Sequence, residues 1–165
     1  MRRKFRRKKG PVQSRKVVVD GITFASGLEK YMHLALKKAK IQAVYEGHTY
    51  EIFPSYQFES SAFERCANGK GDYKDRGNKK ILNISYTPDF IGRGFIIECK
   101  GRANESFPLR WKMFKKYVQE HLPNVILYKP QNQKECDETI RLILKNNKLR
   151  TVSYTHLTLP TIAIV

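Results

Sequence analysis

The sequence contains no run of apolar residues near the ~18 that a membrane-spanning helix needs, and its first residues lack the apolar segment of a secretory signal. It has only three cysteines, Cys66, Cys99 and Cys136, which are widely spaced and form no CxxC pair. Such a set encodes neither a disulfide framework nor a zinc knuckle, and it is typical of a reducing compartment. We therefore expect an intracellular protein that does not enter a membrane.

Acidic residues are scarce as well. The 165 residues include 15 Asp and Glu against 32 Lys and Arg, which gives a net charge of +17. This balance indicates a polyanionic partner, with nucleic acid first and an acidic membrane surface second. The length and the 41% content of hydrophobic residues predict one globular domain.

The positive charge is concentrated at the N-terminus. Residues 1–16 hold nine of the 32 basic residues and no acidic residue, so we expect a disordered arm that binds phosphate. A targeting or solubilising tail is the alternative. The rest of the chain still carries +8, which favours a nucleic-acid role. The candidate DNA contacts in this arm are Arg2, Arg3, Lys4, Arg6, Arg7, Lys8 and Lys9.

The folded domain is expected over residues 17–151, as an α/β fold with a central mixed sheet flanked by helices. A capping box, Ser26 to Glu29, begins the first helix, because the Ser26 hydroxyl can accept the Glu29 amide. The polar segment 60–80 is a loop too long for a simple connector. The other expected elements are strands 43–45 and 49–58, a hairpin of 81–90 and 94–100 at the sheet centre, a helix 108–121, a strand 124–128 and a helix 136–146.

The C-terminal residues 152–165 stand apart from this pattern. They resemble a reading frame through a sequencing-library adapter, so we interpret them as a tail that is not native. A genuine terminal strand is the alternative, since Val152, Tyr154 and Leu157 have β propensity.

Two acidic residues stand out from their apolar surroundings. Asp89 ends one predicted strand, and Glu98 lies in the middle of another, where burying a carboxylate is costly without a partner. Because side chains alternate along a strand, Glu98 and Lys100 point the same way. The hairpin brings Asp89 alongside, and two carboxylates suit Mg²⁺, which activates a water for phosphodiester hydrolysis. Lys100 can orient that water or stabilise charge on the phosphate.

Each part of this pattern has a simpler interpretation. A Glu-x-Lys pair on a strand is often a surface ion pair worth under ~1 kcal/mol. Glu29 can be only the reciprocal member of its capping box. The combination of Pro88-Asp89 with Glu98-Cys99-Lys100 across a glycine hairpin is more specific, and it predicts a nuclease site.

These motifs resemble the PD-(D/E)xK nuclease superfamily. With the further motifs Ser26-Gly27-Leu28-Glu29 and Glu98-Cys99-Lys100-Gly101, the resemblance becomes more specific. Over residues 20–130 the chain is similar to the phage endonuclease I family of Holliday-junction-resolving enzymes. The resemblance implies a restriction-endonuclease-like core, with Glu29, Asp89, Glu98 and Lys100 as the catalytic set. It implies Mg²⁺, for which Mn²⁺ can substitute, held by Glu29, Asp89, Glu98 and the backbone carbonyl of Cys99.

The same resemblance implies a homodimer that exchanges N-terminal elements and cuts branched or four-way DNA in the cytoplasm of a bacterial host. Glu29 can then serve its own or its partner's site. A nuclease of the same superfamily with another substrate, and a non-catalytic basic DNA-binding protein, remain alternatives. The lone Trp111 is expected in the core. The helix 108–121 offers a phosphate track, or simply a solvated face, made of Arg110, Lys112, Lys115 and Lys116.

Overall fold

The computed structural model describes residues 16–101 and 105–155, with side chains up to residue 148. The chain divides into two compact units. Unit 1 comprises Met1–Ala43, Glu98–Arg102 and Tyr128–Val165, and unit 2 comprises Val44–Ile97 and Ala103–Leu127. No helix within the described ranges has the length and apolarity to cross a membrane.

Unit 1 begins with a small hairpin of β1 (Val17–Val19) and β2 (Ile22–Phe24). Its two-residue turn, Asp20-Gly21, places both residues at positive φ, 52° and 76°, which aspartate and glycine tolerate best. The Asp20 carboxylate then accepts a hydrogen bond from Lys37 Nζ at 2.8 Å and lies 3.2 Å from His33 Nε2. These contacts hold the turn against the following helix.

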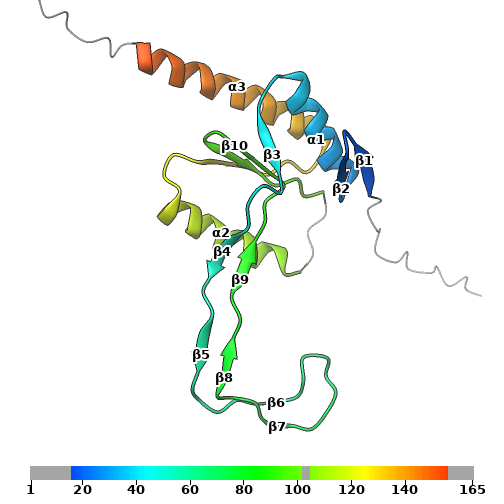
Figure 1. Ribbon diagram of the computed structural model, residues 1–165, viewed down its shortest axis with the longest axis vertical. Helices are drawn as coiled ribbons and strands as arrows, with labels where there is room; N and C mark the ends of the chain where they lie inside the picture. The colour runs from blue at the N-terminus through cyan, green and yellow to red at the C-terminus, as the bar shows by residue number, and fades with distance from the viewer. Residues whose placement is uncertain (1–15, 102–104, 156–165) are drawn as a thin grey trace, which may run out of the picture. The chain divides into compact units, whose positions relative to one another are not determined.

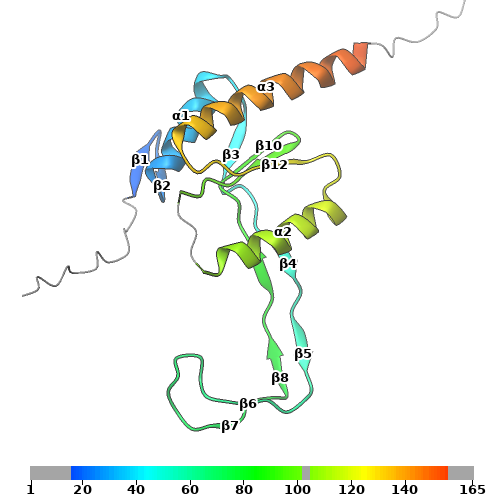
Figure 2. The ribbon, with the colours of Figure 1, turned by 180° about the vertical axis from the view of Figure 1, so that it is seen from behind.

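Helix α1 (Gly27–Lys38) has the predicted start, because Ser26 is its N-cap and Ser26 Oγ accepts a hydrogen bond from the Glu29 amide at 3.2 Å. Its apolar residues Met32 and Leu36, four apart on one face of the helix, are buried. Helix α1 packs against α3 (Gln133–Thr155), and the two lie side by side in both ribbon views (Figures 1 and 2).

Helix α3 is longer than the predicted 136–146. Its early start follows from a second capping box: the Glu135 amide donates to Asn132 Oδ1 at 3.0 Å, and the Glu135 carboxylate accepts from the Gln131 amide at 2.7 Å. The helix continues through Thr155, so the alternative of a strand beginning at Val152 is wrong for those residues. Residues 156–165 of the predicted tail lie outside the described part.

The main sheet has the strand order β12-β11-β10-β3. Its strands are β3 (Ala43–Tyr45), β10 (Phe90–Gly92), β11 (Phe95–Ile97) and β12 (Ile126–Tyr128). Strands β10 and β11 pair antiparallel. The Ile126 amide donates to Gly94 O and the Glu98 amide donates to Tyr128 O, so residue numbers rise in the same direction along both strands. Strand β12 therefore runs parallel to β11, and the sheet is mixed, as predicted.

The predicted hairpin of 81–90 with 94–100 is correct only next to its turn. Phe90–Gly92 pairs with Phe95–Ile97, whereas the earlier strand β9 (Ile84–Tyr86) pairs with β4 (Tyr50–Phe53) instead. Pro88 explains the break, because proline has no N–H to donate to a strand ladder. Strand β11 also ends at Ile97, so Glu98 follows the strand instead of lying in its middle.

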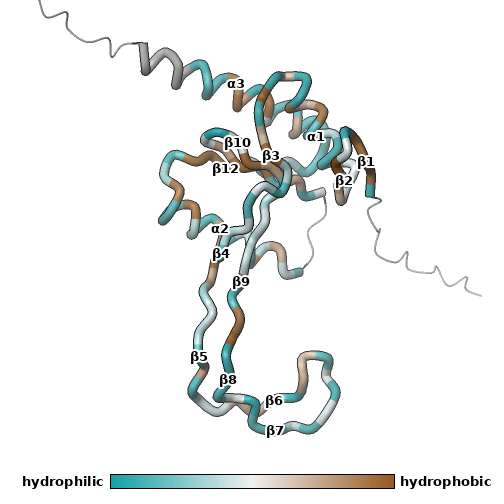
Figure 3. Tube along the Cα trace, in the orientation of Figure 1, coloured by the Kyte–Doolittle hydropathy of each residue, from teal (hydrophilic) through white to brown (hydrophobic). Residues whose placement is uncertain are grey.

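Unit 2 carries a long two-stranded arm (Figure 1), which is built from three successive antiparallel pairs. Strand β4 pairs with β9, β5 (Tyr56–Phe58) with β8 (Lys79–Ile81), and β6 (Phe63–Glu64) with β7 (Lys74–Asp75). The segment 60–80, predicted to be a loop, is therefore the end of a hairpin. Its predicted polarity holds, and the most hydrophobic stretch of the arm lies between β8 and β9 (Figure 3).

The core of unit 2 joins the base of the arm to helix α2 (Phe107–His121), which lies beside β4 (Figure 2). Tyr86 stacks on Phe114 with ring centroids 4.3 Å apart, and Trp111 is buried as expected. Leu109 is 64% exposed, because Phe107 and Trp111 occupy the buried face of the helix instead. The fold is thus α/β, with three helices in the part of the chain described.

Candidate active site

Glu98 and Lys100 lie immediately after the central strand β11. The Glu98 side chain is buried, with the residue 5% exposed, and its Oε1 is 3.8 Å from Lys100 Nζ. The amides of both residues donate to a neighbouring segment, Glu98 to Tyr128 O at 2.9 Å and Lys100 to Pro130 O at 3.0 Å. This alternation continues the strand pattern past Ile97. The predicted pairing of Glu98 with Lys100 is therefore confirmed.

Asp89 lies one residue before β10, between the buried Pro88 and Phe90. Its carbonyl oxygen accepts a hydrogen bond from the Glu46 amide at 2.9 Å, which fixes the backbone at this point. In the hairpin register Phe90 is opposite Ile97, so Asp89 precedes one member of this pair and Glu98 follows the other. Asp89 belongs to unit 2, however, and Glu98 and Lys100 to unit 1.

Glu29 is buried in unit 1, with 6% of the residue exposed. Its carboxylate accepts hydrogen bonds from the Ala25 amide at 2.9 Å and from the Ser26 hydroxyl at 2.7 Å. Because Ser26 Oγ also accepts from the Glu29 amide, the two residues form a reciprocal cap on α1. The structural role weighed for Glu29 is thus present, and its role in a metal site stays a prediction.

The donor chemistry fits a hard cation better than a soft one. The carboxylates of Asp89 and Glu98 and the carbonyl of Cys99 offer oxygen ligands, which Mg²⁺ prefers, and two carboxylates leave room for waters and a phosphate oxygen. Among the residues described, no three or more Asp, Glu, His or Cys side chains are grouped closely enough to hold a metal ion. The metal site therefore stays a prediction from the sequence.

A pair of buried cysteines was missed by sequence reasoning. Cys99, between Glu98 and Lys100, and Cys136, in the first turn of α3, are both buried in unit 1. A hydrogen bond with Cys99 lowers the pKa of the Cys136 thiol. Cysteines so far apart in the sequence gave no spacing signal. The Cys99 side chain is thus a buried packing group.

The four basic residues predicted on α2 are all exposed, and they divide into two kinds. Arg110 donates to Ser85 O at 2.6 Å and lies 5.8 Å from the Tyr86 ring centroid, so it braces the base of the arm. Lys115 lies over Trp111, and Lys116 is 3.8 Å from Glu120. A phosphate-binding role for Lys112, Lys115 and Lys116 stays a prediction. The predicted contacts from Arg2 to Lys9 lie outside the described residues.

Residues 7–130 match the family described as "Protein of unknown function (DUF1064)". No curated protein and no solved structure gives a significant match. The matched range contains all four candidate catalytic residues and the whole two-stranded arm, and it stops before α3.

Proposed function

Because this chain belongs to the DUF1064 family, whose description assigns no activity, we propose its function from its own residues. The proposal is a metal-dependent endonuclease that hydrolyses phosphodiester bonds in branched DNA, a phage-type Holliday junction resolvase. The observation that carries it is the buried Glu98 carboxylate, 3.8 Å from Lys100 Nζ at the end of the central strand. Burying a charge costs several kcal/mol, and a stable fold does not need one here.

The proposed catalytic set of Asp89, Glu98 and Lys100 comes from the sequence motif. In the β10–β11 register Phe90 is opposite Ile97, and Asp89 and Glu98 are the next residues along the two segments. A bound Mg²⁺ or Mn²⁺ would supply Lewis-acid stabilisation of the phosphate and a water of lowered pKa. Asp89, Glu98 and the Cys99 carbonyl would hold the ion, while Lys100 would position the attacking water or stabilise negative charge on the scissile phosphate.

The choice of DNA as substrate has separate support. The net charge of +17 and the exposed lysines of α2 suit a polyanion, and phosphate contacts give affinity without reading sequence. Junction selectivity and a homodimer with exchanged N-terminal elements are proposed from the resemblance to endonuclease I. In such a dimer Glu29 could complete the partner's site while also capping its own helix.

A non-catalytic DNA-binding protein is the second candidate. It is favoured by the use of Glu29 in a helix cap and by the lack, among described residues, of a three-ligand metal group. Metal binding separates the two candidates. A nuclease should bind Mn²⁺ or Mg²⁺ in a titration that Glu98→Gln weakens, and a DNA-binding protein should not bind either ion.

The deciding experiment compares cleavage of a four-way junction and a linear duplex of the same sequence, with Mg²⁺ and with EDTA. We expect paired, metal-dependent nicks near the branch point and an intact linear duplex. Glu98→Gln and Lys100→Ala should abolish cutting and keep binding, whereas the exposed control Glu120→Gln should keep both cutting and binding. Cleavage retained in Glu98→Gln would refute the site, and binding without cutting in any metal would favour the second candidate.

A further inference from the structure

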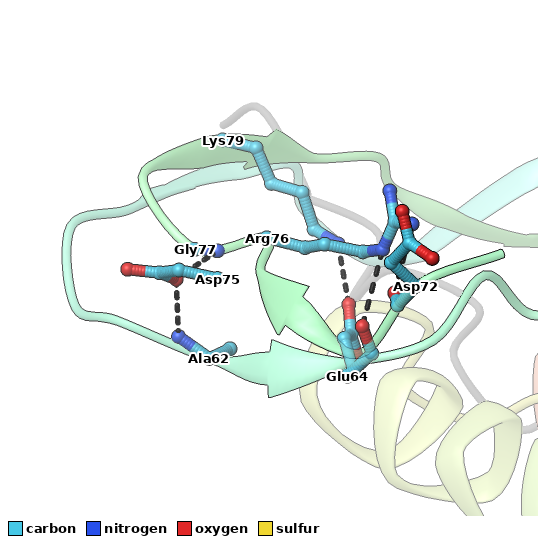
Figure 4. Close-up of polar contacts among 7 residues, drawn as sticks. All are labelled: Ala62, Glu64, Asp72, Asp75, Arg76, Gly77 and Lys79. Carbon is cyan, nitrogen blue, oxygen red and sulfur yellow. Dashed lines mark hydrogen bonds and ion pairs between the residues drawn. The ribbon is translucent and has the colours of Figure 1, made fainter.

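The end of the arm, residues 59–80, is held in shape by its own polar contacts (Figure 4). Lys79 Nζ donates to Glu64 Oε1 at 2.8 Å. Arg76 donates to two backbone carbonyls, that of Glu64 at 3.2 Å and that of Asp72 at 3.5 Å. These contacts join β6, β7 and β8 across the hairpin. We call this segment the arm tip.

Asp75 makes the second set of contacts in the arm tip. Its Oδ1 accepts hydrogen bonds from the amides of Ala62 and Gly77, both at 2.9 Å. A Cβ on Gly77 would stand 2.0 Å from the Ser60 carbonyl oxygen, so only glycine lets the two strands approach here. An exposed segment with this many specific contacts is pre-organised, which lowers the entropy cost of binding a partner.

Two aromatic side chains of the arm tip face solvent. Phe63 is 60% exposed and Tyr73 is 67% exposed, and their ring centroids are 6.2 Å apart. Phe63 is opposite Asp75 in the β6–β7 register, so Tyr73 is its diagonal neighbour on the same face. Folding does not bury these rings. The two rings are tilted by 38° to each other, and each is an exposed aromatic ring of the kind on which nucleic-acid bases stack.

Basic side chains alternate with these rings along the sequence. Arg65, Lys70, Lys74 and Lys80 are exposed, and within the described ranges no carboxylate forms an ion pair with any of them. Of the four acidic residues in the segment, Glu64 is engaged with Lys79 and Asp75 with backbone amides, while Glu59 and Asp72 are exposed and fewer than these four basic residues. The arm tip therefore presents more positive than negative charge to a partner.

We propose that the arm tip is a DNA-contacting surface in addition to the candidate active site. Phe63 and Tyr73 stack on unpaired bases, and the four basic residues bind the neighbouring phosphates. The partner is DNA with unstacked bases, because solvent-facing rings among cations match a single strand or an opened branch point. A second copy of the chain would place the same cations opposite each other, which like charges disfavour. The choice of DNA rests on the proposed function.

The first test uses tryptophan as a reporter. The chain has one tryptophan, Trp111, which is buried, so Tyr73→Trp adds a single exposed fluorophore at the arm tip. Titration with a short single-stranded oligonucleotide in EDTA should quench the added fluorescence by base stacking. Leu34→Trp, exposed on α1, is the control and should show little quenching. Binding measured by anisotropy without quenching of Tyr73→Trp would overturn the proposal.

The second test measures affinity in the same buffer. The double variant Phe63→Ala with Tyr73→Ala should weaken binding to the oligonucleotide and to a four-way junction by roughly tenfold. Tyr73→Phe, which keeps the ring, should bind nearly as tightly as the wild type. Lys70→Gln with Lys74→Gln should lower the slope of log affinity against log salt by about one for each phosphate that the variant no longer neutralises. Amide exchange at Ala62 and Gly77 checks that the arm tip remains folded.

The outcomes separate this inference from the proposed function. Quenching that persists in a protein that never cuts DNA supports the arm-tip surface and removes the nuclease. Metal-dependent cutting, together with unchanged DNA affinity in the alanine and phenylalanine variants, would refute the arm-tip surface and support the nuclease. If the alanine variant instead changes the oligomeric state in light scattering while DNA affinity stays constant, the rings belong to an interface between copies and the proposal is wrong.

Discussion

The hairpin β10–β11 and the arm tip are both antiparallel turns of one chain, yet they treat their carboxylates in opposite ways. In the arm tip, Glu64 and Asp75 are exposed and engage an ammonium and two backbone amides. Beside the central hairpin, Glu98 is buried and its ion-pair partner is Lys100. The first arrangement builds local structure from polar groups that water could also solvate.

The second arrangement makes little sense as structure. An exposed ion pair contributes about 0–1 kcal/mol, whereas a buried one commonly fails to recover the cost of leaving water. An apolar residue at position 98, just after the central strand, would be buried without the cost of removing a charge from water. The comparison teaches that burial, more than presence in a motif, marks a carboxylate as a candidate for chemistry, and Glu98 is that candidate under the proposed function.

The largest expected effect comes from removing the buried charge of Glu98, and removing the exposed charge of Glu64 is its matched control. Glu98→Gln should lower single-turnover cleavage of a four-way junction by roughly 10²–10³-fold or more while leaving thermal stability similar or higher. Glu64→Gln removes the same charge from the arm tip and should leave the rate of the bound complex unchanged. If the two variants cut equally well, burial at Glu98 has no bearing on catalysis.

Gly77→Ala tests whether the arm tip is a built structure. The added methyl group would meet the Ser60 carbonyl oxygen, so the local structure should lose about 1–3 kcal/mol. Hydrogen exchange should rise across residues 59–80, and the exchange of α1 should stay constant. Gly27→Ala is the matched control, because a Cβ at this position meets nothing within 4 Å. Amide hydrogen exchange in this variant should match that of the wild type.

Ser26→Ala separates the two roles of Glu29. Loss of the N-cap should lower the free energy of unfolding by about 1 kcal/mol in urea melts. If Glu29 is also a metal ligand, Glu29→Ala should abolish cleavage whereas Ser26→Ala should preserve it. Equal cleavage by both variants would leave Glu29 as a capping residue alone.

The smallest effect concerns pH. Contacts with Lys79 lower the pKa of Glu64 below its ordinary 4.5, and the Gly77 amide, with Ser61 and Ala62, lowers the pKa of Asp75 below 3.8. A carboxyl group whose pKa is lower in the folded chain stabilises the fold at pH values above its pKa in the unfolded chain. That contribution is lost as the pH falls through its pKa in the folded chain. The arm tip should therefore be unchanged from pH 7 to about 5 and loosen below 4, as Ala62 and Gly77 amide shifts would report. Asp75→Asn should flatten that titration.

Local signals in the sequence predicted the structure best. The Ser26–Glu29 box placed the start of α1 correctly, and the pattern Glu98-x-Lys100 gave the ion pair. The same logic applied to Asn132 and Glu135 would have found the start of α3. The strand pairing after Ile81 was mistaken because Pro88 interrupts the ladder, and a pattern of apolar residues does not say which strand a segment pairs with.

Contacts between distant residues could not be predicted. Nothing in the spacing of Cys99 and Cys136 indicates that their thiols meet, and nothing in the polarity of segment 60–80 distinguishes a loop from a hairpin end. The exposure of Leu109 was equally hidden, since a helix with apolar residues on several faces does not say which face the core selects. The relation of Asp89 to Glu98 rests on register alone.

The arm has a consequence for variation among relatives. Within the described residues its strands bond only to each other, in two-stranded pairs, so one residue can be added to or removed from each strand without disturbing the pairing of Tyr50 with Tyr86. Its length is thus free to drift while the chemistry stays fixed. Under the proposed function, an arm of another length would present its tip to DNA at a different reach, and would select DNA by geometry without changing the residues of the candidate site.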